Sequence, residues 1–204
     1  ACRHGSASML PEDIGPFAVM GGVSRAEQDD FVQLVKTRSK PAALLQVAPI
    51  VLPCDLTFIS QHRGVQMTLA RDTPRGESLS LQVLGRADRA DMRHLADLSK
   101  PGPFEDKTHL LGTFIGLREE GRLVARAGQR MAFPGWVEIS AVSVHPEKQG
   151  NGMGQAIFAA MVNRICAAGQ QPFLHAYADN GGAIRLYRRL GFEIRSDVNF
   201  AFIQ

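Results

Sequence analysis

The residues best suited to chemistry lie in one glycine-rich segment, Gln149-Gly150-Asn151-Gly152-Met153-Gly154. It stands between an apolar stretch typical of a strand and a longer one typical of a helix. Alternate glycines let the backbone turn sharply and let a ligand approach the main-chain N–H groups closely. With the unpaired N–H donors of a first helical turn, these groups can hold an anion, most naturally a pyrophosphate. The sequence therefore predicts a phosphate-binding loop, with a purely structural turn as the alternative.

Two familiar phosphate-binding loops do not fit this segment. A nucleoside-triphosphate loop ends in Gly-Lys-Ser or Gly-Lys-Thr, whereas Met153-Gly154-Gln155 supplies neither the lysine nor the hydroxyl. A dinucleotide loop needs glycine where Gln155 stands, followed by an acidic residue about 20 positions later. Residues 170–178 contain neither Asp nor Glu, so the dinucleotide interpretation also fails.

Two motifs in this part of the chain resemble those of the GNAT superfamily of acetyl-CoA-dependent N-acetyltransferases. The first is Gln149-x-x-Gly152-x-Gly154, which follows Val142-Ser143-Val144-His145-Pro146-Glu147-Lys148. The second is Asn180-x-x-Ala183-x-x-x-Tyr187-x-x-x-Gly191-Phe192, at the family's usual distance downstream. The resemblance extends over residues 113–203, and the helix and turn at 88–104 resemble the family's substrate-side entry.

The resemblance implies acetyl-CoA as the co-substrate. Strands over 138–144 and 172–176 would splay apart and hold the pantetheine arm between them, bonded to main-chain groups of the first strand. The cofactor-binding residues that it implies are Val142, Ser143, Val144, Gln149, Gly150, Asn151, Gly152, Met153, Gly154, Asn180, Ala183 and Tyr187. Asn180 also suits the N-cap of the helix that follows it. The sequence contains no Cys, His and Asp grouping typical of a metal site, so no metal is expected.

The same resemblance implies direct attack of an amine on the thioester, with a main-chain N–H of residues 142–144 stabilising the oxyanion. Tyr187 is the candidate catalytic acid, because a phenol of pKa about 10 can share its proton with a thiolate of pKa about 8.5. A ring that only packs is the alternative. Glu138 is the candidate catalytic base, with a surface charge at a strand end as the alternative. His145 and His175 are rival bases, and a satisfied core histidine is the other interpretation of His175.

The elements that must position these residues are predicted from apolar periodicity, capping and turn residues. Helices are expected over Arg25 to Thr37, Arg89 to Leu98, Gln155 to Ala168 and Ala183 to Leu190. Strands are expected over Ala43 to Val47, Val65 to Leu69, Leu79 to Leu84, Thr113 to Leu117, Leu123 to Phe133, Trp136 to Val144, Pro172 to Ala176, Phe192 to Ile194 and Asn199 to Ile203. Ser24 and Glu27 have the spacing of a capping box.

Together with the resemblance, these elements predict an α/β (α+β) fold class: a GNAT-type mixed, mostly antiparallel twisted sheet flanked by helices, with an N-terminal α/β extension. Residues 1–87 are expected to form an N-terminal α/β subdomain, and residues 88–204 the GNAT acetyltransferase domain. The first part offers no residue set for chemistry and is expected to flank or wall the site. A degenerate half-copy of the GNAT fold is a second interpretation of it. Acceptor specificity is expected in residues 1–110.

Composition limits the class of protein. The 204 residues are 45% apolar and 21% charged, enough for a buried core and unlike a disordered chain. No apolar run approaches the roughly 18 residues of a membrane span, and residues 1–9 lack the apolar stretch of a secretory signal. The net charge of +3 is spread out, which gives no support for nucleic-acid binding. The cysteines, Cys2, Cys54 and Cys166, form no CxxC pair and fit a reducing cytoplasm, with Cys166 expected as a buried small hydrophobe.

The sequence thus predicts a cytoplasmic N-acetyltransferase that moves the acetyl group of acetyl-CoA to a primary amine on a small molecule or peptide. No nucleic-acid or membrane partner is expected, and a homodimer is left open. The alternative is a non-catalytic acyl-CoA-binding sensor or regulatory module of the same fold.

Overall fold

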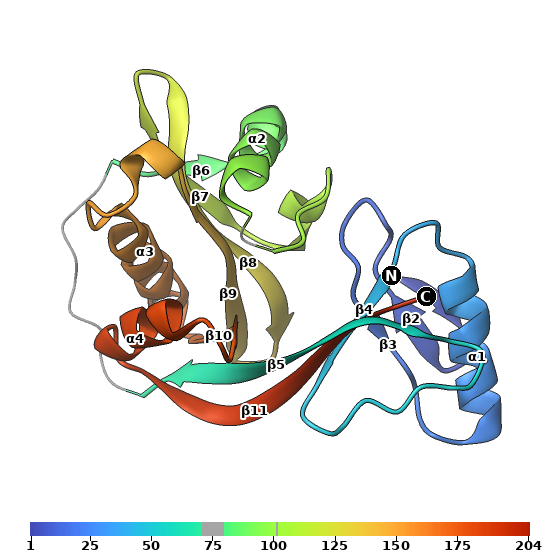
Figure 1. Cartoon of the computed structure of the whole chain (residues 1–204). Helices are drawn as coiled ribbons and strands as arrows, with labels where there is room; N and C mark the ends of the chain where they lie inside the picture. The colour runs from blue at the N-terminus through green and yellow to red at the C-terminus, as the bar shows by residue number, and fades with distance from the viewer. Residues whose placement is uncertain (71–79, 101) are drawn as a thin grey trace.

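The computed structural model describes residues 1–70, 80–100 and 102–204, and it has two lobes joined by shared strands (Figure 1). The larger sheet has the strand order β4-β11-β5-β10-β9-β8-β7-β6. Its strands are β4 (Ala42–Gln46), β5 (Phe58–Leu69), β6 (Gln82–Leu84), β7 (Phe114–Glu119), β8 (Arg122–Phe133), β9 (Trp136–Val144), β10 (Gln171–Tyr177) and β11 (Phe192–Ile203). A smaller sheet in the N-terminal lobe contains β1 (Cys2–His4), β2 (Ala7–Met9) and β3 (Ala18–Val19).

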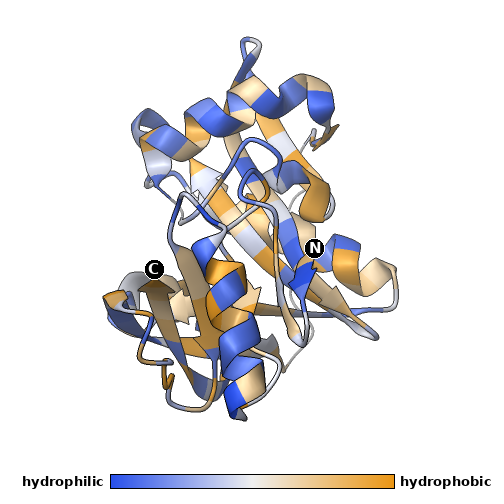
Figure 2. Ribbon diagram, turned by 90° about the vertical axis from the view of Figure 1, so that its right-hand side faces the viewer, coloured by the Kyte–Doolittle hydropathy of each residue, from blue (hydrophilic) through white to orange (hydrophobic). Residues whose placement is uncertain are grey.

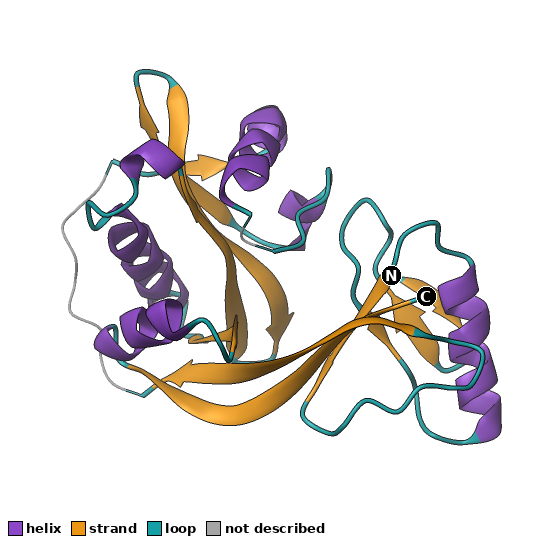
Figure 3. Ribbon diagram, in the orientation of Figure 1, coloured by secondary structure: helices purple, strands orange, loops and turns teal. Residues whose placement is uncertain are grey.

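Helices cover both sides of the larger sheet (Figure 3). The α-helices are α1 (Arg25–Lys36), α2 (Arg89–Ser99), α3 (Met153–Ala167) and α4 (Gly181–Arg189), and the short 3-10 helices are η1 (Arg86–Asp88), η2 (Thr108–Leu111) and η3 (Pro146–Lys148). In Figure 1, α3 and α4 lie on one side of β9 and α2 on the other, while α1 belongs to the N-terminal lobe. Hydrophilic and hydrophobic residues alternate along the helices, as Figure 2 shows, because each helix buries only one side.

Each helix layer has its own hydrophobic cluster. The cluster between α3 and the larger sheet includes Met67, Ala125, Ala127, Ile139, Ile157, Met161 and Leu174. The cluster under α2 includes Met92, Leu95, Phe104 and Phe114, and that of the N-terminal lobe includes Phe31, Val35, Ala42, Ala201 and Ile203. Successive side chains of a strand point to opposite faces, so Arg126, between two alanines of the α3 side, faces the α2 side.

The point at which β9 and β10 separate organises the site. These strands are parallel and pair only from Trp136 to Glu138 on β9, opposite Gln171 to Phe173 on β10. Beyond these pairs β9 continues to Val144 and β10 to Tyr177. The splay that the family resemblance implies is therefore present. It leaves one main-chain edge of β9 without a neighbouring strand from about residue 139 onward.

Two long strands, β5 and β11, run through both lobes, and β4 pairs with the end of β11 at residues 199–203 (Figure 1). The main chain of Gln204 exchanges hydrogen bonds with that of Thr57, at 2.8 and 3.1 Å. Strands from residues 1–87 therefore pair with strands from the rest of the chain. The division at residue 87 stays a prediction, and the larger sheet extends across that position.

The element predictions are confirmed in type, with differences at the ends. Ser24 and Glu27 form the expected capping box at the start of α1. The two strands expected at 192–194 and 199–203 are one strand, because a register shift between Ile194 and Ser196 absorbs the polar interruption. β5 begins at Phe58 rather than Val65, since pairing with β11 extends a segment whose exposed side chains hide its strand character. Leu79 and Pro101, which belong to predicted segments, lie outside the described residues.

Candidate active site

The glycine loop joins η3 to α3. Gly150 has φ +83° and Gly152, the N-cap of α3, has φ +76°, a left-handed backbone that residues with a Cβ rarely adopt. A Cβ built on either residue would meet no atom within 4 Å. Space above the backbone is therefore open at both positions, as a bound anion would require. The side chain of Gln149 donates to the carbonyl of Val144 at 3.2 Å and ties the loop back to β9.

A β-bulge distorts β9 where it leaves β10. Arg126 pairs with Ser143 and Gly128 with Ser140, so Ala141 and Val142 together stand opposite one residue of β8. Ala141 has φ +53°, in the left-handed region that few alanines occupy. A bulge breaks the regular ladder and turns the local backbone, which redirects main-chain groups toward the splay.

An open pocket of about 170 Å³ lies beside the splay. Ser140, His175 and Tyr177 line it from β9 and β10, and Asn180, Ala183 and Tyr187 line it from α4 and its N-cap. The N-terminal lobe supplies Phe17 and Leu45, and β11 supplies Val198 and Phe200. Residues 1–87 thus contribute Phe17, Leu45 and Gly64 to the pocket lining, and their expected role as a wall of the site stays a prediction.

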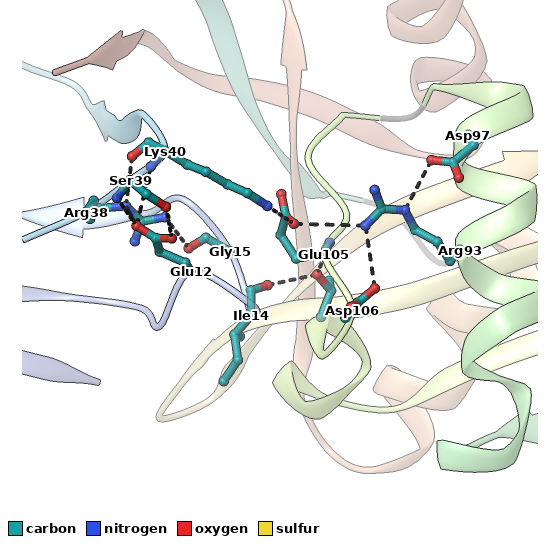
Figure 4. A network of polar contacts seen from close by, with 11 residues as sticks. Glu12, Ile14, Gly15, Arg38, Ser39, Lys40, Arg93, Asp97, Glu105 and Asp106 are labelled. Atoms are coloured by element: carbon teal, nitrogen blue, oxygen red, sulfur yellow. Dashed lines mark hydrogen bonds and ion pairs between the residues drawn. The ribbon is translucent and has the colours of Figure 1, made fainter.

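A polar network fastens the N-terminal lobe to the segment that carries Gly102 and Pro103 of the pocket (Figure 4). Lys40 pairs with Glu105 at 2.9 Å, and the hydroxyl of Thr108 donates to the carbonyl of Ile14 at 2.8 Å. Glu105 also lies 3.9 Å from Arg93 of α2. These contacts link α2, the 102–108 segment and the loop before Phe17, so they join segments that supply Gly102, Pro103 and Phe17 to the pocket wall.

Glu138 is fully buried, with 0% of its side chain exposed. Its carboxylate accepts hydrogen bonds from Nε of Arg130, at 2.8 Å, from Nη2 of Arg130, and from Nδ1 of His175, at 2.7 Å. Burial alone would raise the pKa of Glu138, but the nearby charge of Arg130 and the hydrogen bond from His175 hold it at about 2. Its interpretation as a surface charge at a strand end is therefore wrong. Its role as a base stays a prediction, although a carboxylate of such low pKa accepts protons poorly.

His175 is held by partners on both ring nitrogens. Nδ1 faces Glu138, and Nε2 lies 3.1 Å from the amide nitrogen of Gln66. Arg195 donates to Oε1 of Gln66 at 2.6 Å, which turns the NH2 of that amide toward the histidine. One proton arrangement satisfies the whole series: a neutral His175 with its proton on Nδ1 and its Nε2 lone pair accepting from Gln66. In this arrangement His175 positions Glu138 and has no lone pair to offer an amine.

His145, the second rival base, serves as a cap. Its Nδ1 accepts from the main-chain N–H of Glu147 at 3.4 Å, at the start of η3. Its Nε2 lies 3.1 Å from Nη2 of Arg122. Both nitrogens thus contact groups of β8 and η3, and the pocket lining does not include His145.

Tyr187 and Asn180 each combine a structural contact with a position in the pocket wall. Oδ1 of Asn180 accepts from the N–H of Ala183 at 3.1 Å, which confirms the predicted cap of α4. The ring of Tyr187 packs on Phe158, with centroids 4.9 Å apart. Burial raises the pKa of Tyr187, so its hydroxyl keeps its proton at neutral pH. A protonated phenol at the pocket is the form that can donate to a thiolate.

Sequence patterns did not indicate the partners that fix the site. Arg130 was not singled out, although the hairpin through residues 134–135 places β8 beside β9 and so brings Arg130 to Glu138. Gln66 and Arg195 lie 109 and 129 residues from their partners in the chain, too far apart for local patterns to connect them. Cys166 is exposed, not buried as expected, because it lies on the outer side of α3. Over the described ranges, no cluster of three or more His, Cys, Asp or Glu side chains could hold a metal, and no helix could cross a membrane.

Comparisons with known proteins agree with this geometry. The family model "FR47-like protein" matches residues 114–201. The crystal structure of a putative acetyltransferase of the GNAT family from Novosphingobium aromaticivorans is 30% identical, with a TM-score of 0.88, and the match covers 97% of this chain and 87% of that one. This chain belongs to the GNAT family of acetyltransferases. A GCN5-related N-acetyltransferase from Kribbella flavida, 18% identical over 91% of this chain and 79% of that one, shares the fold with a TM-score of 0.62.

Curated relatives match over a shorter stretch. Mycothiol acetyltransferase of Kocuria rhizophila is 44% identical over 61 residues, 29% of this chain, and that of Saccharomonospora viridis is 39% identical over 66 residues, 31% of this chain. The matched stretch covers 20% and 22% of those two proteins. The chain thus matches about a fifth of the length of these relatives, too little to transfer their acceptor.

Proposed function

We propose that this GNAT protein transfers the acetyl group of acetyl-CoA to a primary amine. The observation that carries the proposal is the splay of β9 from β10, which opens an unpaired strand edge between the glycine loop and the pocket. A strand edge can bind an extended chain, and a glycine loop at a helix N-terminus can bind phosphate. The two features lie in series along β9 and α3, as a long molecule with a diphosphate would require.

The residues proposed to hold acetyl-CoA are those that the two motifs indicate. Main-chain groups of Gln149, Gly150, Asn151, Gly152, Met153 and Gly154 would hold the pyrophosphate, and the open space at Gly150 and Gly152 fits this role. Val142, Ser143 and Val144 would bind the arm through their main chain, since the side chain of Ser143 is buried. Asn180, Ala183 and Tyr187 would contact it from α4. The thioester supplies the activated acyl group.

In the proposed reaction the amine nitrogen forms a bond to the thioester carbonyl carbon, the C–S bond breaks, and the thiolate leaves. Tyr187 donates its proton to the thiolate, because burial keeps the phenol protonated. Main-chain N–H groups at the bulge around Val142 stabilise the oxyanion. The predicted base, Glu138, is bonded to Arg130 and His175, and both of these residues line the pocket. We propose that Glu138 positions these two side chains and that the amine proton leaves through water.

The name of the curated relatives specifies mycothiol for those proteins alone, so the acceptor of this chain must be inferred from its own pocket. We also propose a cytoplasmic location, because Cys2 and Cys54 carry exposed free thiols, which persist in reducing compartments. A homodimer stays a prediction.

The glycine loop offers a matched test of cofactor binding. Gly152→Ala places a methyl group in the proposed diphosphate site. Gly169→Ala adds the same methyl group just after the C-terminal end of α3, where φ is +71° and the space is also open. We expect calorimetry to show coenzyme A binding weakened about tenfold or more by the first change and unchanged by the second. Equal affinity for the two variants would remove the loop from cofactor binding, and no binding by the unaltered protein would end the proposal.

Turnover is tested separately by thiol release from acetyl-CoA with a panel of primary amines. Tyr187→Phe keeps the ring packing on Phe158 and removes the hydroxyl. We expect turnover to fall about a hundredfold with coenzyme A affinity preserved. Unchanged turnover would exclude Tyr187 as the acid. Tight coenzyme A binding without turnover of any amine would favour the sensor alternative.

A further inference from the structure

Part of the pocket wall is built of aromatic rings from three distant segments. Phe17 comes from the N-terminal lobe, Tyr177 from the end of β10, and Phe200 from β11. Ring centroids are 5.8 Å apart for Tyr177 and Phe200 and 6.4 Å apart for Phe17 and Phe200. His62, with its ring 5.3 Å from that of Tyr177, extends the cluster behind the wall. These spacings lie in the range in which aromatic rings attract one another.

The pocket lining is poor in acids. None of the described residues that line the pocket is Asp or Glu, and the charged side chain at its wall is Arg130. The guanidinium of Arg130 lies 4.5 Å over the ring of Phe17 and is already paired with the buried Glu138. A polyamine or a lysine-rich peptide would therefore find no carboxylate in the pocket to replace the water lost by its ammonium groups.

An acid-free pocket also changes the chemistry of a bound amine. Transfer of an ammonium group from water to an apolar site lowers its pKa, and the described lining residues include no carboxylate to raise it again. Both features favour the neutral amine, which is the form that attacks a thioester. The same walls that exclude a highly charged acceptor thus help a singly charged one to react.

Provided that the protein is an acetyltransferase as proposed, we infer that its acceptor is a primary amine on an aromatic ring, an arylalkylamine. The ring lies against Phe17, Tyr177 and Phe200, and its amine points toward Ser140 and the splay. Leu45 and Val198 complete the apolar contact. The three rings that would select the acceptor lie outside the two family motifs, so the motifs do not predict this preference.

The test compares 2-phenylethylamine with butylamine and spermidine in the thiol-release assay. We expect kcat/KM for 2-phenylethylamine to exceed that for either aliphatic amine about tenfold or more. Phe200→Leu and Phe17→Leu, which keep apolar volume and remove the ring, each reduce that advantage about fivefold. Phe133→Leu, half exposed and outside the pocket lining, leaves it unchanged. A preference for spermidine, or an aromatic preference that survives both pocket changes, overturns the inference.

A binding measurement separates this inference from the proposed function. Calorimetry with 2-phenylethylamine in the presence of coenzyme A is expected to show binding that Phe200→Leu weakens. If this binding occurs and no thiol is released, the acceptor pocket stands and the catalytic proposal fails. If coenzyme A binds and aliphatic amines turn over while 2-phenylethylamine does not bind, the acceptor inference fails and the catalytic proposal stands.

Discussion

Two arginines of β8, the partly buried Arg130 and the fully buried Arg126, contrast sharply. Arg130 is held by Glu138 beside the pocket, and that pair continues through His175 to Gln66. Arg126, four residues earlier, has 0% exposure and no hydrogen-bond partner at any of its three guanidinium nitrogens within the described residues. Its guanidinium instead lies 3.7 Å over the ring of Phe104 in the cluster under α2. One strand thus carries a paired charge at the site and an unpaired charge in the core.

The difference shows what the polar network at the pocket contributes. A buried pair costs much desolvation, and removal of one partner leaves the other charge uncompensated. The unpaired guanidinium of Arg126 already carries this desolvation cost, which is offset only by its contact with the ring of Phe104. Removing a charge from the Arg130–Glu138 pair should therefore lower the stability of the fold. Removing the charge of Arg126 should raise it.

The largest effect is expected from Glu138→Gln. The change leaves Arg130 with a neutral partner in a buried site and weakens the hold on His175. We expect the free energy of unfolding in urea to fall by about 3–5 kcal/mol. Glu119→Gln, which breaks a half-exposed pair with Lys148, is the control and should cost about 0–1 kcal/mol. Equal losses would show that burial of the Glu138 pair adds nothing.

Acid sensitivity sharpens the same contrast. The folded-state pKa of Glu138 is about 2, below the ordinary value of 4.5 for a glutamate carboxyl. The stability contributed by this lowered pKa is fully present above pH 4.5 and is lost as the pH falls toward 2. Unfolding followed from pH 6 down to about pH 2 should show this loss in the unaltered protein and not in Glu138→Gln. The same slope in both proteins would assign the acid sensitivity to other groups.

A smaller effect, of opposite sign, is expected from Arg126→Met. An unbranched apolar side chain fits the space between Phe104 and the sheet and removes the buried charge, so stability should rise by about 1–4 kcal/mol. Burial lowers the pKa of Arg126 from 12.5 to about 9. The destabilisation by the buried charge is therefore fully present below pH 9 and decreases as the pH rises above 9. The gain in stability of Arg126→Met over the unaltered protein should decrease over the same pH range. Arg122→Met, at an exposed position, is the control, and a destabilised Arg126→Met would show that the guanidinium has a function in the core.

The smallest effect is expected at the contact between the lobes. Lys40 and Glu105 pair at 2.9 Å, with the lysine largely exposed. Lys40→Ala should lower stability by about 0–1 kcal/mol, and added salt should reduce the difference. A loss comparable to that of Glu138→Gln would mean that the pair is part of a tightly coupled network (Figure 4).

Features that depend on residues close together in the sequence could be predicted, and features that depend on distant residues could not. The glycine loop, the cap at Asn180 and the α-helices depend on residues a few positions apart. The cap is confirmed, and each helix begins and ends within two residues of its predicted ends. The partners of His175 and the aromatic end of the pocket depend on strands that meet only after folding. Phe17 and Phe200 are 183 positions apart, and no local period relates them. The burial of Glu138 was missed because charged residues are seldom buried without a partner, and its partner lies across a hairpin.

β5 and β11 restrict how far the two lobes can move relative to each other. Each passes without interruption from the site into the N-terminal lobe, and β11 alone carries Phe192 of the second motif, Phe200 of the pocket and Ile203 of the distant core. Two lobes tied by continuous strands cannot open like jaws about a flexible linker. We therefore expect substrates to enter the open pocket without a hinge motion of the lobes. A mutation that loosens the remote lobe is expected to alter the pocket wall without touching the reacting atoms.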